Sequence, residues 1–377
     1  MKRLLFVLCS LVAVQEVCAR RPAVRFDLPY TVEHGKYVVV LGTPAGPRRF
    51  IFDTGASGTC ISESLRDELG AEIVKTQKVR DFEGHVVPID LVRLDSLRMG
   101  DALFRDHPVL VMPDTSLVFA CLRVDGIAGC DLLRWCAVRM PNADSTITVT
   151  DDVRTLGLPR GRRMSRMELG GGCPFLPVTC RNGDRQARMY VKFDTGSAGY
   201  FHFSYADSGD APPPLWFIDS LRWADGYASA IGWTNRNRVN SHFRGTIPRF
   251  EIQGTAIADM PVKRTFGHNR ILGCKLFDWG QVVLDFRRKR FLFIPRGARR
   301  KPRRSPPVIL RWPFPPGSSS SGRCGTRRSR TSSPPATASS RSTGTPGTAT
   351  SADSCSTPTR WTVRCAGSGR PPGSMLS

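Results

Sequence analysis

Two closely similar nine-residue segments constrain the fold of this chain more than any other feature. They are FIFDTGASG at residues 50–58 and VKFDTGSAG at residues 191–199. In each segment an apolar stretch ends at an Asp, which is followed by Thr, Gly and further small residues; the two aspartates, Asp53 and Asp194, lie 141 residues apart. One such triplet is a weak motif, but a second copy in matching surroundings indicates an internal repeat.

A second repeated element supports this interpretation. GCDLLRW at 129–135 matches GCKLFDW at 273–279 in its Gly, Cys, Leu and Trp, with an offset of 144 residues. Before each Asp-Thr-Gly, two apolar runs flank a Gly-containing turn, which predicts a β-hairpin that delivers the Asp at a strand end. The repeat therefore predicts an all-β fold of two homologous β-barrel-like lobes with short helices.

The repeat also sets the expected domain boundaries. We expect a first lobe over residues 20–153, a linker over 154–168 and a second lobe over 169–296. The linker contains Gly and five Arg, a composition that predicts an exposed loop and a site of proteolytic nicking.

With both elements doubled, the chain resembles the two-lobed aspartic peptidases of the pepsin and retropepsin clan, closest in style to bacterial retropepsin-like proteases. The family pattern is an apolar residue, Asp-Thr-Gly and a small residue, followed by two apolar residues and Gly, once per lobe. The resemblance covers about residues 26–296. The first lobe is shorter than in pepsins, and no clear flap Tyr follows Asp53.

The resemblance implies an aspartic-type endopeptidase, a hydrolase in which Asp53 and Asp194 form the catalytic pair. Two adjacent carboxyl groups that share one proton provide both a base for water and an acid for the scissile carbonyl. The family pattern implies that the pair is supported by Thr54, Gly55, Thr195, Gly196 and Ser197. It also places Gly129 and Gly273 beneath the two loops, where a side chain would clash.

The residue three positions after each Asp predicts which carboxyl group holds the proton. A hydroxyl at that place in the family can donate a hydrogen bond to the carboxylate and favour its charged form. Ser197 offers this hydroxyl and Ala56 does not. We therefore expect Asp194 to be ionised and Asp53 to be protonated. Asp131, whose counterpart is Lys275, is expected to be a structural acid at a helix start.

Each half also contains a candidate hairpin that would cover a substrate. Residues 79–91 have a polar, Gly-containing tip between two strand-like runs, and residues 222–233 occupy a similar place in the second half. A surface hairpin that binds no ligand has the same pattern. The candidate substrate-binding residues are Phe82, Glu83, Gly84, His85 and Tyr227.

Cysteine and histidine patterns give little support for a metal. Among the seven Cys of the globular region, Cys173 and Cys180 could form a disulfide if the chain is exported, whereas Cys130 and Cys274 lie in apolar contexts. No CxxC pair and no HExxH motif occur. We expect neither a metal nor another cofactor.

The N-terminal residues 1–19 resemble a secretory signal peptide. Lys2 and Arg3 precede an apolar run at 4–14, and cleavage after Ala19 fits the small residues there. An uncleaved anchor is the alternative. No other apolar run approaches membrane length. We therefore expect a secreted or periplasmic protein with no transmembrane segment in the mature chain.

The net charge of +23 is concentrated in one region. Residues 297–377 hold fourteen Lys and Arg and one acid, Asp353, in a Ser-, Thr-, Pro- and Gly-rich sequence that cannot bury a core. They are either a disordered basic tail or the product of a frame change. We expect a polypeptide substrate, no specific nucleic acid and a monomer. The rival interpretation is a non-catalytic peptide-binding protein with the same fold.

Overall fold

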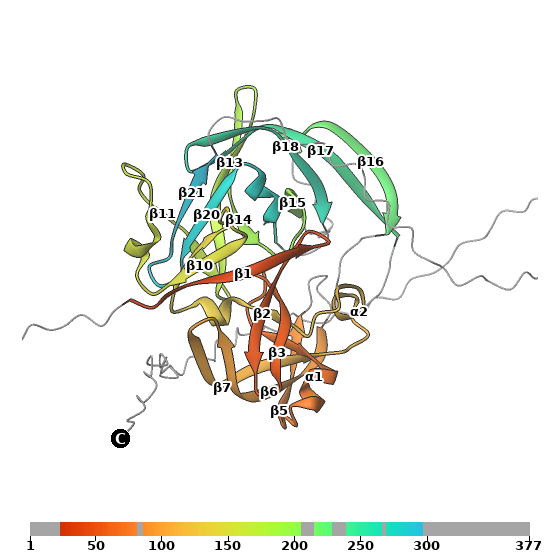
Figure 1. Ribbon diagram of the computed structural model, residues 1–377. Helices are drawn as coiled ribbons and strands as arrows, with labels where there is room; N and C mark the ends of the chain where they lie inside the picture. Colours follow the sequence, from red (N-terminus) through yellow and green to blue (C-terminus); the bar gives the residue numbers. More distant parts are fainter. Residues whose placement is uncertain (1–22, 81–85, 205–214, 228–238, 266–268, 297–377) are drawn as a thin grey trace, which may run out of the picture. The chain divides into compact units, whose positions relative to one another are not determined.

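The computed structural model describes residues 23–80, 86–204, 215–227, 239–265 and 269–296, and most of these residues lie in β-strands (Figure 1). This confirms the all-β prediction. The helices of this part of the chain are short: α1 (Glu63–Glu68), α2 (Leu117–Leu122), η1 (Cys130–Leu133), η2 (Val153–Leu156) and η3 (Cys274–Asp278). Within these ranges, no helix has the length and apolar character needed to cross a membrane.

The first half of the chain forms a closed ring of six strands. Around the ring, the order is β2 (Lys36–Thr43), β3 (Gly46–Phe52), β8 (Gly126–Ala128), β4 (Cys60–Ser62), β7 (Ala102–Met112) and β6 (Val86–Met99). The ring closes where Gly42 of β2 lies opposite Arg98 of β6. β5 (Ile73–Arg80) extends the sheet beyond β6. We call this ring the first barrel.

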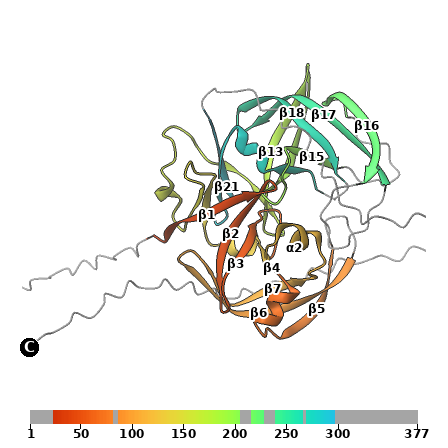
Figure 2. The ribbon, with the colours of Figure 1, turned by 45° about the vertical axis from the view of Figure 1, so that its right-hand side comes forward.

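The second half repeats the ring with the same strand order. Its strands are β13 (Cys173–Asn182), β14 (Arg185–Asp194), β19 (Ile271–Gly273), β15 (Phe201–Ser204), β18 (Thr255–Thr265) and β17 (Val239–Ile252), and it closes through β13 and β17. β12 (Glu168–Gly170) and β16 (Asp219–Tyr227) flank this second barrel. Figure 2 shows β16 beside β17.

Strand directions repeat along with strand order. β3 pairs with β8 in parallel, and β14 pairs with β19 in parallel. β4 and β15 each make one parallel and one antiparallel pairing, with β7 and β8 in the first barrel and with β18 and β19 in the second. Matching order and direction confirm the prediction of two β-barrel-like lobes.

Alternation along the strands explains the two cores. Side chains of a strand point to opposite faces in turn, so every second residue of a barrel strand reaches the interior. In β17, Phe243 and Ile247 are buried while Arg244 between them is exposed. The largest fully buried side chains include Phe50 and Phe52 in the first barrel and Phe193 and Phe250 in the second.

A further antiparallel sheet draws its strands from both halves of the chain. Its order is β11 (Ser165–Arg166), β21 (Arg290–Pro295), β20 (Gly280–Asp285), β9 (Ala137–Met140), β10 (Thr146–Thr150) and β1 (Arg25–Glu33). β20 pairs with β9, so the end of the second half completes a sheet begun in the first. β1 continues from this shared sheet to pair with β2 of the first barrel.

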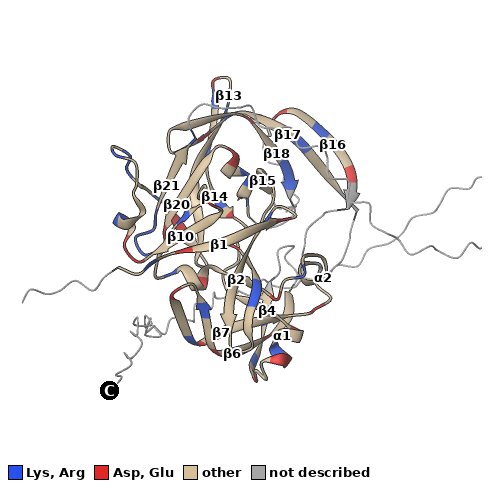
Figure 3. Cartoon of the chain, viewed as in Figure 1, with Lys and Arg blue, Asp and Glu red and all other residues tan. Residues whose placement is uncertain are grey.

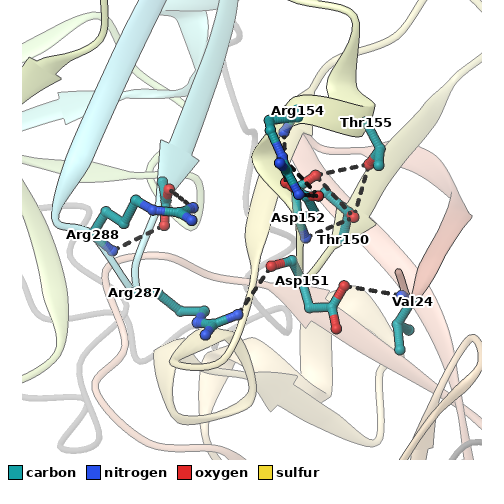
Figure 4. A network of polar contacts seen from close by, with 9 residues as sticks. Val24, Thr150, Asp151, Asp152, Arg154, Thr155, Arg287 and Arg288 are labelled. Atoms are coloured by element: carbon teal, nitrogen blue, oxygen red, sulfur yellow. Dashed lines mark hydrogen bonds and ion pairs between the residues drawn. The ribbon is translucent and has the colours of Figure 1, made fainter. Parts of the chain in front are cut away.

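The expected linker is more ordered than a simple exposed loop. Leu156 and Met167 are buried, and β11 pairs with β21. Near its start, Arg287 donates a hydrogen bond to the backbone oxygen of Asp151, whose carboxylate accepts one from the Val24 amide (Figure 4). Residues 159–163 between these anchors are exposed, so the nicking prediction applies to this shorter stretch.

All seven cysteines of the described ranges are free thiols. Cys173 and Cys180 lie seven residues apart on the same strand, β13. An extended strand places such residues about 23 Å apart, so they do not form the considered bridge. Cys130 and Cys274 are buried, as their apolar contexts predict. The expected signal peptide at 1–19 and the basic tail at 297–377 lie outside the described residues.

Candidate active site

The two aspartates occupy equivalent positions in the two barrels. Asp53 follows the last residue of β3, and Asp194 is the last residue of β14. The Asp53 amide donates to the Ala128 oxygen at 3.0 Å, and Asp194 lies opposite Gly273 in the parallel pair of β14 and β19. Each Asp therefore stands at the end of a hairpin strand, as the sequence predicts.

The carboxyl group of each Asp lies against the loop of the other barrel. A Cβ atom built on Gly55 would stand 2.3 Å from Cγ of Asp194, and one built on Gly196 would stand 2.4 Å from Cγ of Asp53. No real side chain tolerates such a contact, so only Gly fits at either position. The missing side chains are what let the two carboxyl groups approach each other.

Two buried threonines join the loops by a reciprocal set of hydrogen bonds. The Thr54 amide donates to Oγ1 of Thr195 at 3.0 Å, and the Thr195 amide donates to Oγ1 of Thr54 at 3.1 Å. Each hydroxyl then donates at 2.7 Å to a backbone oxygen of the opposite barrel, Thr54 to Phe193 and Thr195 to Phe52. Both threonines are fully buried, so these four bonds fix the two loops relative to each other.

The two carboxyl groups have different environments. Oδ1 of Asp53 accepts hydrogen bonds from the amides of Gly55 and Ala56, at 2.7 and 3.1 Å. Oδ1 of Asp194 is fully buried and has no hydrogen-bond partner within the described ranges. Burial raises the pKa of Asp194 to about 7, and the neighbouring charge of Asp53 adds to this shift, while Lys36 and Lys192 oppose it.

This asymmetry reverses the protonation pattern expected from Ser197. Burial without a hydrogen-bond donor favours the neutral form of Asp194. The Ser197 amide donates to the backbone oxygen of Asp194 at 3.2 Å, and the Asp194 Oδ1 atom receives no bond from the Ser197 hydroxyl. The raised pKa thus favours a neutral Asp194, which is opposite to the expectation from Ser197.

The second repeated element lies directly against the aspartate loops. A Cβ atom on Gly129 would meet the Gly58 backbone at 2.5 Å, and one on Gly273 would meet the Gly199 oxygen at 2.3 Å. The cysteine after each glycine donates its amide to the loop at 2.9 Å, to Ala56 in the first barrel and Ser197 in the second. The predicted place of Gly129 and Gly273 is confirmed.

A polar network around Asp131 supports the first loop. Asp131, in the first turn of η1, accepts hydrogen bonds from the amide of Thr59 at 3.0 Å and from its hydroxyl at 2.8 Å. It also contacts Nε2 of the fully buried His107 at 3.0 Å. Asp131 is thus a structural acid, as expected. His107 was not predicted, although an isolated His beside the apolar run 108–112 is a signal of a buried polar contact.

Two lysines beside the aspartates were also missed. Lys36 Nζ donates to the Gly196 oxygen, and Lys192 Nζ donates to the Gly55 oxygen at 3.2 Å. Lys192 interrupts the apolar strand two residues before Asp194. A charge within a strand that otherwise leads to a buried loop is the sequence signal that could have identified it.

The expected substrate-covering hairpins form, but their tips lie outside the described residues. β5 and β6 pair up to Arg80 and Val86, so Phe82, Glu83, Gly84 and His85 fall in the undescribed tip. β16 and β17 pair up to Tyr227 and Val239. Tyr227 ends its strand, and its side chain lies outside the described part. The role of these five residues stays a prediction.

The described ranges contain no group of three or more His, Cys, Asp or Glu side chains arranged to hold a metal ion. The chemistry available at the site is that of two adjacent carboxyl groups, one of which has a raised pKa, with two lysine ammonium groups nearby. Such a pair can accept a proton from water with one member and donate a proton with the other.

A comparison with known families agrees with this geometry for part of the chain. Residues 38–132 match the family model described as Aspartyl protease. The matched stretch begins in β2, includes Asp53 and ends in η1, so it covers most of the first barrel. No curated protein matches this chain.

Proposed function

We propose that this chain is an aspartic-type endopeptidase that hydrolyses peptide bonds with Asp53 and Asp194. The observation that carries the proposal is the reciprocal arrangement of the two loops. Thr54 and Thr195 join them, and each aspartate carboxyl group lies on the glycine of the opposite loop. The match of residues 38–132 to an aspartyl protease family supports the same activity.

The asymmetry of the pair assigns the proposed roles. Asp53, ionised, accepts a proton from a water molecule, whose oxygen attacks the carbonyl carbon of the scissile peptide bond. Asp194, neutral, donates its proton to the carbonyl oxygen as the tetrahedral intermediate forms. The intermediate then breaks its C–N bond, and the proton held by Asp53 passes to the leaving amine. The carboxyl product returns a proton to Asp194 from its second hydroxyl group, which restores the starting state.

Because one chain contains both aspartates, we propose that the monomer is sufficient. The lobes are then residues 20–153 and 169–296, joined by 154–168 and by the shared sheet. Activity per molecule should stay constant on dilution through the nanomolar range. A site assembled between two chains would instead lose activity steeply on dilution.

The alternative is a non-catalytic peptide-binding protein with this fold. The raised pKa of the buried Asp194 carboxyl group argues against this alternative. A protein that only binds peptides has no need of such a group, whereas shifted pKa values are common at catalytic sites. A binding protein would retain peptides after the aspartates are replaced and would release no new amino termini before or after the change.

Digestion of an unbiased peptide library tests the proposal. Wild type should cleave, whereas Asp53→Asn and Asp194→Asn should each lose at least about 1,000-fold of kcat/KM while they keep the fold. Asp184→Asn is the matched control, because Asp184 is exposed in the turn between β13 and β14. Turnover by either active-site variant at the level of this control would rule the pair out.

The cellular location of the protein and the role of its basic tail are separate parts of the proposal. We propose secretion or periplasmic export through residues 1–19 and a polypeptide substrate, with no specific nucleic acid. If the basic tail has no part in catalysis, deletion of residues 301–377 leaves kcat/KM unchanged. A nucleic-acid-binding role would appear as salt-dependent affinity that this deletion abolishes.

A further inference from the structure

Two lysine ammonium groups reach the aspartate pair from opposite barrels. Lys36 begins β2 of the first barrel and donates to the Gly196 oxygen in the second. Lys192 lies on β14 of the second barrel and donates to the Gly55 oxygen in the first, at 3.2 Å. Each glycine is the one on which the opposite aspartate carboxyl group packs. The lysines therefore flank the pair on both sides.

Both lysines are placed where a bound peptide would meet them. Lys192 is two residues from Asp194 on the same strand, so both side chains emerge from the same face. The alternate residue, Phe193, is fully buried in the core. Lys36 and Lys192 are each partly exposed, as are the two aspartates. Their charges act on the reaction centre, since both lower the pKa of Asp194 against the effect of burial.

The hydrogen-bond partners of the two lysines carry no charge, so these bonds do not neutralise the ammonium groups. Each ammonium group donates to a backbone carbonyl oxygen, which is a neutral acceptor. An aspartate pair that shares one proton carries a single negative charge, so two lysines beside it make the site net positive. A positively charged cleft favours ligands of negative charge and disfavours those of positive charge.

The positive region continues from Lys36 over the second barrel. Lys263, Arg244 and Arg222 lie directly opposite one another across β18, β17 and β16, and Lys263 also lies opposite His202 of β15. Burial, Lys263 and Lys36 lower the pKa of His202 to about 3, so His202 is itself neutral and the charge of Lys36 acts on this row. Lys and Arg residues on β16, β17 and β18 appear in blue in Figure 3.

Like charges on directly opposed residues of neighbouring strands destabilise a sheet. The neighbouring strands β16, β17 and β18 nevertheless carry Arg222, Arg244 and Lys263 in register. Packing gives no reason for this row, because Arg222 and Arg244 are exposed. An anionic ligand that approaches the aspartate pair along this face would offset the repulsion.

We propose that Lys36 and Lys192 are specificity-determining residues that select peptides with a carboxylate side chain next to the scissile bond. This inference rests on the proposed endopeptidase activity and names its substrate class, acidic peptides. The lysine that meets the substrate carboxylate exchanges a neutral carbonyl acceptor for a charged one, and a hydrogen bond between charged groups is the stronger of the two.

The test compares peptides that differ only in charge. Matched peptides with Glu or Gln on either side of the cleaved bond have nearly the same size, so the ratio of their kcat/KM values isolates the carboxylate. Wild type should prefer Glu over Gln by about 10-fold or more on at least one side. The preference should decrease with added salt, because salt screens charge pairs at exposed sites.

Variants of the lysines then connect the preference to its source. Lys36→Met and Lys192→Met should each reduce the Glu-to-Gln ratio, and the double variant should bring it near one. Lys192→Arg should keep the ratio, and Lys192→Glu should shift the preference toward Lys. Arg188→Met is the matched control, because Arg188 lies exposed on the same strand and face as Lys192 and should leave the ratio unchanged.

The outcomes separate this inference from the proposed function. Wild type that cleaves Glu and Gln peptides equally well overturns the lysine assignment and leaves the endopeptidase in place. A preference that the double Met variant retains also overturns it. Lysines that only hold the loops would change overall activity but not the ratio. Wild type that cleaves no peptide of an unbiased library overturns the proposed function, and the inference with it.

Discussion

Thr54 and Thr195 each donate an amide hydrogen bond to the hydroxyl group of the other, at 3.0 and 3.1 Å, although they are 141 residues apart in the chain. Each hydroxyl group also donates to a backbone oxygen of the opposite barrel at 2.7 Å. The distance between the aspartate carboxyl groups depends on this junction, because each aspartate immediately precedes one of these threonines.

Replacing either threonine by Val should destabilise the protein more than replacing it by Ser. Val keeps the shape but leaves the opposite amide buried without an acceptor, at a cost of about 1–3 kcal/mol. Ser retains the hydroxyl group and should lose less. Urea unfolding of Thr54→Val, Thr54→Ser and the two Thr195 variants measures this. A larger loss for Ser than for Val would mean that packing of the methyl group, and not the hydrogen bonds, holds the junction.

The raised pKa of Asp194 should make stability depend on pH in a defined window. An unfolded Asp releases its proton near pH 4, whereas Asp194 in the folded state holds it up to about pH 7. The folded state therefore binds more protons between these values, and the free energy of unfolding decreases as the pH rises through the window. Asp194→Asn cannot ionise, so it should be more stable than wild type at pH 8 by roughly 1–3 kcal/mol.

Denaturant unfolding of wild type and Asp194→Asn at pH 4 and pH 8 checks this sign. The gain should nearly vanish at pH 4, where the folded carboxyl group is protonated and the unfolded one is still about half protonated. Asp184→Asn, which changes an exposed carboxylate, should show no such difference between the two pH values. A wild type that is the more stable protein at pH 8 would contradict the assignment of the proton to Asp194.

Ser197→Ala should leave the acid limb of the pH–rate profile within about 0.3 pH units of wild type. In the proposed mechanism that limb reports the member of the pair that accepts a proton from water, Asp53, and the Ser197 hydroxyl makes no hydrogen bond to the Asp194 Oδ1 atom. The family resemblance alone predicts an upward shift instead. A clear upward shift in kcat/KM profiles would therefore restore Asp194 as the ionised member.

Asp131→Ala should destabilise the first barrel by about 2 kcal/mol or more, because it leaves the amide and hydroxyl of Thr59 without their acceptor. The repeat offers a matched comparison in Lys275→Ala at the equivalent position after Gly273. Lys275 packs over the Tyr200 ring and should cost less. Equal losses in the free energy of unfolding, measured by chemical denaturation, would show that the hydrogen bonds of Asp131 contribute no more than the Lys275 side chain does at the equivalent position.

The repeated motifs predict the barrels well because they mark equivalent points of one supersecondary unit. The hairpin before each aspartate, and the glycines Gly129 and Gly273 beneath each loop, follow from local patterns and from close backbone contacts that exclude any side chain. Features fixed by local geometry and by the repeat are therefore available from the sequence.

Features that depend on pairing between distant segments, or that occur in one half alone, cannot be predicted from the sequence in this way. An apolar strand such as β20 has no local signal that names β9 as its partner. The raised pKa of Asp194 depends on its burial and on the charge of Asp53, whose carboxyl group receives two amide hydrogen bonds. The repeat does not reveal this difference, because the sequences around the two aspartates match. Lys192 and His107 break the symmetry between the halves, so an argument from the repeat passes over them.

The sheet shared by both halves also determines the order in which the protein is completed during synthesis. All strands of the first barrel are present once residue 128 has been made, but β9 has no partner on one edge until residues 280–285 emerge. An unpaired edge strand is a template for association with other chains, and pairing over such a separation is slow. Nascent chains and truncation products that end before β20 should therefore be the forms that aggregate and that need protection by chaperones.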